Sequence, residues 1–151
     1  TAQRLEQPQK PDLNPVSITA KALSSLQSEF VRLQDAQTSS RGVHCSAISD
    51  GEKILVLADD IGRHNTLDKL KGYVLLRAPE LKPSILLSTG RISSEMLQKA
   101  ARIGASVIVS FTSPNAFTVS LAREWGMTLI GYARGSRFNV YSHPERFSDL
   151  A

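Results

Sequence analysis

The sequence predicts an α/β protein, a three-layer α/β/α sandwich around a mixed sheet. Two short and wholly apolar stretches, SILLS at 84–88 and SVIVS at 106–110, alternate with stretches of helical period. Buried strands that alternate with helices are typical of a parallel sheet covered on both faces. Two further apolar runs flank the pair Asp50-Gly51, which indicates a β-hairpin. The hairpin adds antiparallel strands, so the predicted sheet is mixed.

The first part of the chain is expected to give one helix and the two hairpin strands. Asn14 before Pro15 fits an N-cap followed by proline at the first helical position. The helix should run to about Ala36, because apolar residues repeat at helical spacing: Leu23, Leu26, Phe30 and Leu33. The hairpin strands are VHCSAIS and KILVLAD.

Three more helices follow, and each has a recognisable start and end. The starts are expected at Asn65, Ser93 and the pair Ser113-Pro114, and the ends before Pro79, at Gly104 and at Gly126. Ile92 and Leu97 are placed as a hydrophobic staple across the second start. The stretches MTLIGYA and FNVYS are read as the remaining strands.

Composition indicates one globular domain, expected at 14–151 behind a disordered or extended lead at 1–13. No apolar run approaches the roughly 20 residues of a membrane span, and the polar start is not a signal peptide. The single cysteine, Cys45, excludes an internal disulfide and fits a reducing cytoplasm. The net charge of +4 and the pI of about 9.5 favour anionic partners in general.

A glycine lies beside an arginine after each of three predicted strands: Gly62-Arg63, Gly90-Arg91, and Arg134-Gly135 with Arg137. Ligands of open α/β sheets bind beyond the carboxyl ends of the strands. Glycine lets the backbone approach a ligand, and arginine offers a planar fork of donors to phosphate oxygens. The helix start at Ser93 and Ser94 adds free N–H groups. The pattern predicts a pocket for a ligand with several phosphates.

Neighbouring residues allow other interpretations. Asp59 and Asp60 could bind Mg²⁺ on a phosphate ligand or read a base edge, although adjacent acids more often cap a turn or pair with an arginine. His64 could act as a general base. His44 and Cys45 are neighbours on a predicted strand, so their side chains should point to opposite faces. Cys45 is therefore expected to be a buried apolar residue.

The longest motifs resemble those of the FdhD family of formate dehydrogenase accessory proteins. The segments that carry the resemblance are RGVHCSA, DIGRHNTLDK, STGRISSEMLQKAARIGASVIVS and LIGYARGSRFNVYSHPERF. They are in order and correctly spaced between about residue 13 and residue 147. The resemblance implies a fold like that of cytidine deaminases, with a mixed five-stranded sheet.

The resemblance also implies a function. Proteins of this family are similar to sulfurtransferases that take sulfur from a cysteine desulfurase. They pass it to the molybdenum or tungsten bis(molybdopterin guanine dinucleotide) cofactor of formate dehydrogenase. A homodimer is implied as well. From composition and the single cysteine, a cytoplasmic protein without a nucleic acid or membrane partner is expected. GDP would mimic part of this cofactor.

The family's cofactor-binding segment falls here on six consecutive residues: Tyr132, Ala133, Arg134, Gly135, Ser136 and Arg137. The loops GRISSE and DIGRHN are expected to line the same pocket through Arg91, Ser93, Ser94, Arg63 and His64. No residue here is assigned a catalytic or metal-binding role.

One departure from the family concerns the sulfur carrier. The family carries sulfur as a persulfide on a CxxC motif shortly before the helix expected near Asn14, and this sequence has no CxxC. The missing initiator Met and the polar lead favour truncation over loss of the motif. The chain as it stands is expected to bind the cofactor but not to transfer sulfur through that motif.

The alternatives to a sulfurtransferase domain are a cofactor chaperone without chemistry and a guanine-nucleotide phosphohydrolase that uses Asp59 or Asp60 with Mg²⁺ and His64. RNA binding ranks last, because only 6% of residues are aromatic and they are scattered. A zinc deaminase is excluded, since the corresponding helix starts, GRHNTLD and GRISSEM, contain neither the H-x-E element nor the cysteines of P-C-x-x-C.

Overall fold

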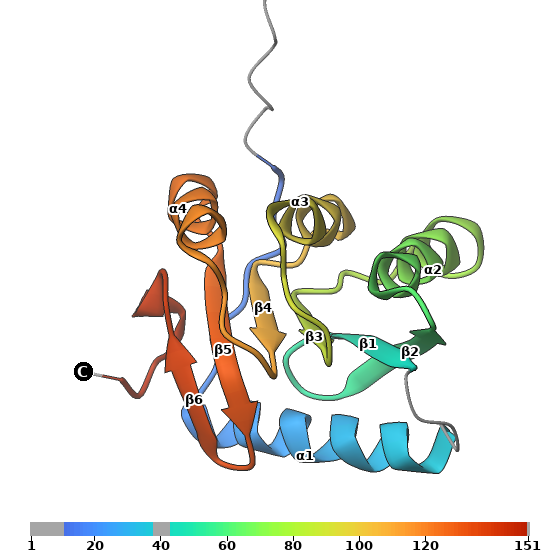
Figure 1. Ribbon diagram of the computed structural model, residues 1–151, viewed down its shortest axis with the longest axis horizontal. Helices are drawn as coiled ribbons and strands as arrows, with labels where there is room; N and C mark the ends of the chain where they lie inside the picture. The colour runs from blue at the N-terminus through green and yellow to red at the C-terminus, as the bar shows by residue number, and fades with distance from the viewer. Residues whose placement is uncertain (1–10, 38–42, 151) are drawn as a thin grey trace, which may run out of the picture.

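The computed structural model describes residues 11–37 and 43–150, and these form one six-stranded sheet packed between helices (Figure 1). The helices are α1 (Ala20–Gln37), α2 (Arg63–Leu76), α3 (Ser94–Ile103) and α4 (Ala116–Trp125). The strands are β1 (His44–Ser49), β2 (Ile54–Asp60), β3 (Ile85–Ser88), β4 (Val107–Ser110), β5 (Thr128–Arg134) and β6 (Arg137–Val140). None of the helices in these residues combines the length and apolarity that crossing a membrane requires.

The three predicted layers are confirmed. Helices α2, α3 and α4 cover one face of the sheet, and α1 crosses the other face (Figure 1). Each face has its own apolar core, with Leu67, Met96 and Leu129 in the core under α2–α4 and Leu23, Phe30 and Val109 in the core under α1.

The predicted count of five strands is wrong, because β6 extends the sheet at one edge. The strand order is β2-β1-β3-β4-β5-β6, and β6 pairs with β5 in the antiparallel direction. Gly135 makes the tight return between them, since its φ of 60° lies in the left-handed region that favours glycine. The hairpin predicted at Asp50-Gly51 is confirmed between β1 and β2.

Strand directions bring four carboxyl ends to one edge of the sheet. Strands β3, β4 and β5 are parallel, and β1 is antiparallel to both β2 and β3. Strand β2 therefore runs in the same direction as β3. The chain leaves β2, β3 and β4 at this edge and enters α2, α3 and α4 there.

Three predicted helix starts are wrong, while the caps of α3 are confirmed. Asn14 does not cap α1, because its amide donates to the carbonyl of Pro83 at 2.8 Å and so holds an extended segment against the sheet end. Thr19 caps α1 instead, and its Oγ1 accepts from the N–H of Ala22 at 3.0 Å. Ser93 and Gly104 begin and end α3 as predicted.

The N-cap of helix α2 lies three residues earlier than expected. Gly62 is its N-cap, and Asn65 lies inside the helix, where its amide donates to Asp60 at 3.1 Å. An asparagine near a helix start can cap it or bind back to the preceding turn, and here it does the second. Helix α4 ends at Gly126 as predicted, but its cap is Asn115 rather than Ser113.

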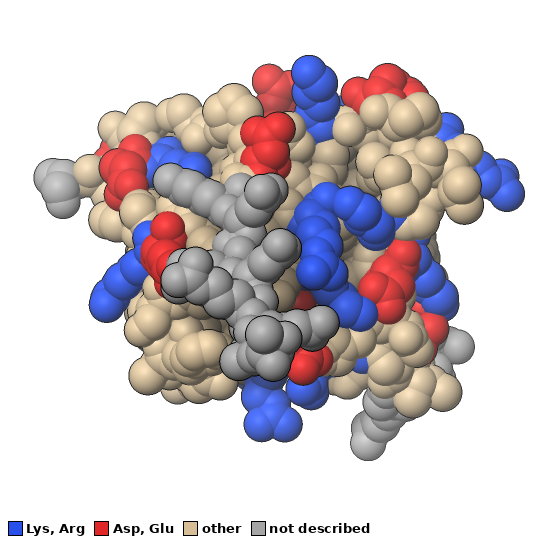
Figure 2. Space-filling model, turned by 90° about the horizontal axis from the view of Figure 1, so that it is seen from above, with Lys and Arg blue, Asp and Glu red and all other residues tan. Residues whose placement is uncertain are grey.

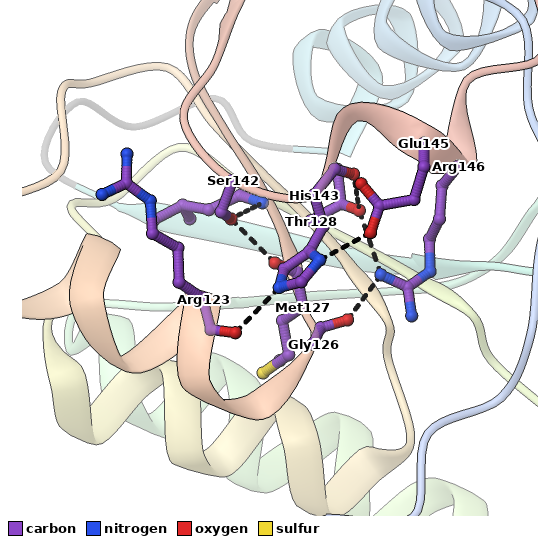
Figure 3. A network of polar contacts seen from close by, with 9 residues as sticks. Arg123, Gly126, Met127, Thr128, Ser142, His143, Glu145 and Arg146 are labelled. Atoms are coloured by element: carbon purple, nitrogen blue, oxygen red, sulfur yellow. Dashed lines mark hydrogen bonds and ion pairs between the residues drawn. The ribbon is translucent and has the colours of Figure 1, made fainter.

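A polar network fastens the segment after β6 to the end of α4 (Figure 3). One ring nitrogen of His143 lies 2.6 Å from the carboxylate of Glu145, and the other lies 2.8 Å from the carbonyl of Arg123. Arg146 donates to the carbonyl of Gly126 at 2.6 Å. These contacts hold the segment 143–146 against α4, and the chain continues from there to the start of α1.

The segment then binds the start of α1. Ile18 forms an isolated parallel bridge with Phe147, and the amide of Ala20 lies 3.1 Å from the carboxylate oxygens of Asp149. Phe147 also stacks on Phe138 of β6 at a ring distance of 5.5 Å. The β5–β6 hairpin and the amino end of α1 are thereby held together.

Candidate functional site

A pocket of about 440 Å³ lies where the chain leaves the sheet for α2, α3 and α4. We call it the strand-end pocket, and its lining residues are Arg63, Arg91, Ile92, Ser93, Ser113, Pro114 and Asn115. Two of these residues are cations and none is an acid. Ser93 and Asn115 are the N-caps of α3 and α4, so two helix starts face the pocket. Unpaired N–H groups and the positive end of the helix dipole both favour anions there.

Arg63 has an unusual environment in this pocket. Its Nε is buried and makes no hydrogen bond within the described part of the chain. A buried and unpaired guanidinium N–H is costly, and an anionic ligand would remove that cost. Gly90 leaves room for the Arg63 side chain, because a Cβ on residue 90 would lie 3.2 Å from Cβ of Arg63 and 3.4 Å from the His44 ring.

A network of buried hydroxyl groups supports the floor of the pocket. Ser88 Oγ accepts from the N–H of Gly90 at 3.2 Å, and Ser110 Oγ donates to the Gly90 carbonyl at 2.9 Å. Ser46 Oγ donates to Ser88 Oγ at 3.0 Å and lies 2.7 Å from the hydroxyl of Thr66. Thr66 in turn donates to the carbonyl of Arg63, which ties α2 to the same network. The loop at Gly90 is therefore held from both sides.

Four residues of segment 132–137, where the resemblance predicts cofactor binding, line a second pocket, of about 670 Å³, at the β5–β6 hairpin. We call it the hairpin pocket, and its lining residues are Ala20, Tyr132, Arg134, Ser136, Arg137, Phe138, Asn139, Val140 and Leu150. It presents two arginines and two aromatic rings. The amide of Ala20 at the start of α1 is already bound by Asp149.

The structure thus distributes the expected site residues over two pockets. Arg63, Arg91 and Ser93 meet in one, whereas Tyr132, Arg134, Ser136 and Arg137 meet in the other. Ala133 is buried, Gly135 forms the turn, and Ser94 and His64 lie half-buried beside the strand-end pocket at the starts of α3 and α2.

The two pockets are joined at Gly131. A Cβ there would lie 2.7 Å from the carbonyl of Thr112 and 3.0 Å from Pro114, which belong to the loop before α4. The next residue, Tyr132, donates its N–H to the same Thr112 carbonyl at 3.2 Å. Only glycine permits this approach of β5 to the loop, so Gly131 fixes the distance between the pockets.

A further basic surface lies between α2 and α3. Lys71, Lys99 and Arg102 line a small groove there with Asp68, and Lys99 pairs with that acid at 2.9 Å. Figure 2 shows Lys and Arg side chains gathered on the face that α2–α4 form. Part of the net positive charge therefore lies outside both pockets.

The carboxylate of Asp60 stabilises the turn between β2 and the start of α2. Its Oδ1 accepts from the N–H of Gly62 at 2.9 Å and from Asn65, and its Oδ2 pairs with Lys69 at 2.9 Å. The hydrogen bond from Gly62, followed by those from Lys69 and Asn65, holds the pKa of this carboxyl well below its usual range. No group of three metal-binding side chains occurs among the residues described.

We expect Asp60→Asn to lower the melting temperature at pH 7 and to have a smaller effect at pH 3. A depressed folded-state pKa stabilises the fold fully above the unfolded pKa of about 3.9, and this contribution declines as the pH falls from that value towards the lowered folded-state pKa. Thermal unfolding of both proteins at the two pH values measures this. A difference that stays constant with pH would contradict the assigned contacts.

Cys45 is unsuited to nucleophilic chemistry. It is fully buried under α1, and burial, with the nearby Asp59 carboxylate as a second cause, raises the pKa of its thiol to about 11. The expectation of a buried apolar residue is confirmed.

At pH 8 we expect only about one Cys45 side chain in a thousand to be a thiolate. Iodoacetamide should therefore modify the native protein at least about 100-fold more slowly than the urea-unfolded protein. Equal rates in the two states, measured by intact mass, would show that the thiol is accessible.

Sequence reasoning missed three features of the site. The first is the buried hydroxyl network under Gly90, which could have been inferred because Ser88 and Ser110 end the apolar strands SILLS and SVIVS. Asn115 as a cap was hidden by the preceding Ser113-Pro114. The irregular pairing of β5 with β6 beyond Gly131 left no recognisable pattern.

The fold and the pockets define a class: an α/β/α protein with two arginine-lined pockets near the carboxyl ends of its strands. A family model described as "FdhD/NarQ family" matches residues 1–148, and the chain belongs to this family. The recognition made from the motifs is confirmed.

Relatives of known name support the same assignment. The chain is 39% identical over 140 residues to the Sulfur carrier protein FdhD of Bacillus subtilis (strain 168), which covers 93% of this chain and 53% of that protein. It is 41% identical to the protein of the same name from Staphylococcus haemolyticus, over 91% of this chain and 52% of that protein. The chain spans about half the length of these relatives.

A solved structure has the same fold. It is described as a formate dehydrogenase accessory protein from Desulfotalea psychrophila, with a TM-score of 0.78 and 32% identity. The alignment covers 90% of this chain and 60% of the other.

Proposed function

We propose that this chain is the cofactor-binding part of a formate dehydrogenase maturation protein, and that it binds the molybdenum bis(molybdopterin guanine dinucleotide) cofactor as cargo. The observation that carries the proposal is the buried and unpaired Nε of Arg63 in a pocket lined by a second arginine, by two helix starts and by no acid. The names of the relatives, sulfur carrier and formate dehydrogenase accessory protein, support the same role.

The two pockets fit the chemistry of this cargo. A bis(guanine dinucleotide) carries two pyrophosphate groups, and each pocket offers two arginines with donors suited to phosphate oxygens. Arg63 and Arg91 would hold phosphate oxygens in the strand-end pocket, together with N–H groups of α3 and α4. Arg134 and Arg137 would do so in the hairpin pocket, where Tyr132 and Phe138 offer rings against which a guanine could pack.

The proposal includes a part in sulfur transfer from a cysteine desulfurase to the bound cofactor. Within this chain the residues that support it bind and orient the cofactor. Cys45 does not supply the carrier thiol, because it is buried and its pKa is raised to about 11. For these residues alone the second candidate, a cofactor chaperone without sulfur chemistry, is therefore equally consistent with the site.

The phosphohydrolase alternative loses support. It requires a carboxylate free to bind Mg²⁺ at the ligand. Both oxygens of Asp60 already have partners in the fold, and Asp59 is not among the residues that line either pocket. His64 lies at the start of α2 and is not among the residues that line either pocket.

Three further expectations remain proposals: a homodimer in the cytoplasm, docking to a desulfurase and to formate dehydrogenase, and kinship with the cytidine deaminase fold. A second copy would find an open strand edge at β2, where α2 exposes Tyr73 and Leu76 beside it. The strand order, with an antiparallel β1 beside three parallel strands, supports the fold kinship.

Calorimetric titration with GDP, with AMP as the control, tests the proposal. We expect GDP to bind more tightly than AMP, and Arg134→Ala and Arg137→Ala each to weaken GDP binding about tenfold without loss of thermal stability. Equal affinity for GDP in wild type and both variants would remove the hairpin pocket from the site. No preference for GDP would argue against a guanine dinucleotide.

A further inference from the structure

We propose that Gln27 is a positioning residue that holds the nucleotide-binding segment 132–137 in its binding conformation. This inference rests on the proposed function and extends it to a residue of α1 that lines neither pocket. Gln27 is only 3% exposed, and its Nε2 donates to the carbonyl of Ala133 at 2.9 Å. The contact joins the first helix to the segment that carries the site.

The segment needs support from outside its own hairpin. The pairing of β5 with β6 is irregular between Gly131 and Arg134, and Tyr132 and Ala133 have no partner in the strand register. Tyr132 has a φ of 52°, in the left-handed region that bulky side chains rarely adopt. Such a conformation persists only where surrounding contacts impose it.

Two hydrogen bonds hold this conformation, one to the loop before α4 and one from α1. The N–H of Tyr132 donates to the Thr112 carbonyl of the loop before α4, and the carbonyl of Ala133 accepts from Gln27 of α1. Buried Ala133 lies between Tyr132 and Arg134, which are both exposed. Fixing its carbonyl therefore sets where these two side chains emerge into the hairpin pocket.

Stability does not explain an amide at this position. The Oε1 of Gln27 is buried and has no partner among the described residues, which costs about 1–3 kcal/mol relative to a paired acceptor. Its neighbours on the buried face of α1, Leu23, Leu26 and Phe30, are all apolar. An apolar side chain would remove that cost but would leave the Ala133 carbonyl without its donor, at a similar cost, so the amide brings no net gain in stability. What Gln27 adds is the bond to Ala133.

The test compares Gln27→Leu and Gln27→Glu with wild type by GDP titration and thermal unfolding. We expect Gln27→Leu to weaken GDP binding about five- to tenfold while its melting temperature changes little, because loss of the unpaired Oε1 offsets loss of the donor to Ala133. Gln27→Glu should bind weakly at pH 8.5 and recover as the pH falls to 5.5, because a protonated carboxyl can donate to the Ala133 carbonyl. Wild type measured over the same range corrects for titration of GDP.

Ser84→Ala is the matched control, since Ser84 Oγ is also buried with no partner in the described ranges but lies before β3, at the opposite end of the sheet. It should leave GDP affinity unchanged. If Gln27→Leu binds like wild type, or if it loses stability and Gln27→Glu shows no recovery at low pH, the positioning role is overturned while the proposed function stands. If wild type does not bind GDP, the proposed function fails and this inference fails with it.

Discussion

Arg63→Ala is expected to weaken GDP binding about 10- to 100-fold. A hydrogen bond that involves a charged group contributes about 1.5–3 kcal/mol, and the buried Nε of Arg63 has no partner to lose among the residues that the structure describes. The substitution removes the cation of the strand-end pocket that lies deepest against Gly90. Calorimetry at constant ionic strength measures the change, and thermal unfolding verifies that the variant is folded.

Arg32→Ala is the control for this experiment. Arg32 lies on the exposed face of α1, where it pairs with Glu29 at 2.7 Å, and its loss changes the net charge by the same amount. We expect it to leave GDP affinity unchanged. If Arg63→Ala and Arg32→Ala bind GDP with equal affinity, any loss of affinity comes from the change in net charge, and the strand-end pocket is not the binding site.

Gly131→Ala is expected to destabilise the fold by about 1–3 kcal/mol and to weaken nucleotide binding as well. A Cβ at this position would lie 2.7 Å from the Thr112 carbonyl, 2.9 Å from the Tyr141 ring and 3.0 Å from Pro114. A backbone carbonyl cannot yield as a flexible side chain does, so β5 must move away from the loop before α4. Urea unfolding and GDP titration of the same variant measure both effects.

The same substitution at Gly72 should act in the opposite direction. Gly72 lies inside α2, and a Cβ there would contact nothing within 4 Å. Alanine is preferred to glycine within helices, so we expect a gain of about 0.5–1 kcal/mol with unchanged binding. Destabilisation of similar size at both positions would contradict the close approach at Gly131.

Local patterns in the sequence predicted most of the fold. Strands β3 and β4 lie where their apolar runs predicted them. Helices α3 and α4 end at the predicted glycines, since few other conformations suit a glycine at that place. Asn14 and Asn65 misled because asparagine next to a turn can cap a helix or bind a distant carbonyl, and only tertiary contacts select between these. Strand β6 was foreseen as a last strand, but the count of five came from the family resemblance.

The candidate site was only partly predictable for the same reason. Strand-end geometry brings Arg63 and Arg91 together, because parallel strands deliver their loops to one edge. The separation of Arg134 and Arg137 into a second pocket depends on the bulge after Gly131. The bond from Gln27 to Ala133 spans 106 residues, and no local pattern encodes such a contact.

The most direct test of the account is a titration of ¹⁵N-labelled protein with GDP, followed by amide chemical shifts. Both pockets are proposed to bind the phosphate groups of guanine dinucleotides, through Arg63 and Arg91 in one pocket and through the 132–137 segment in the other. We therefore expect shift changes at the starts of α3 and α4, at Ser94 and Ala116, and at Gly135 and Arg137. Changes confined to the groove between α2 and α3 or to the outer face of α1, or no changes at millimolar GDP, would contradict it.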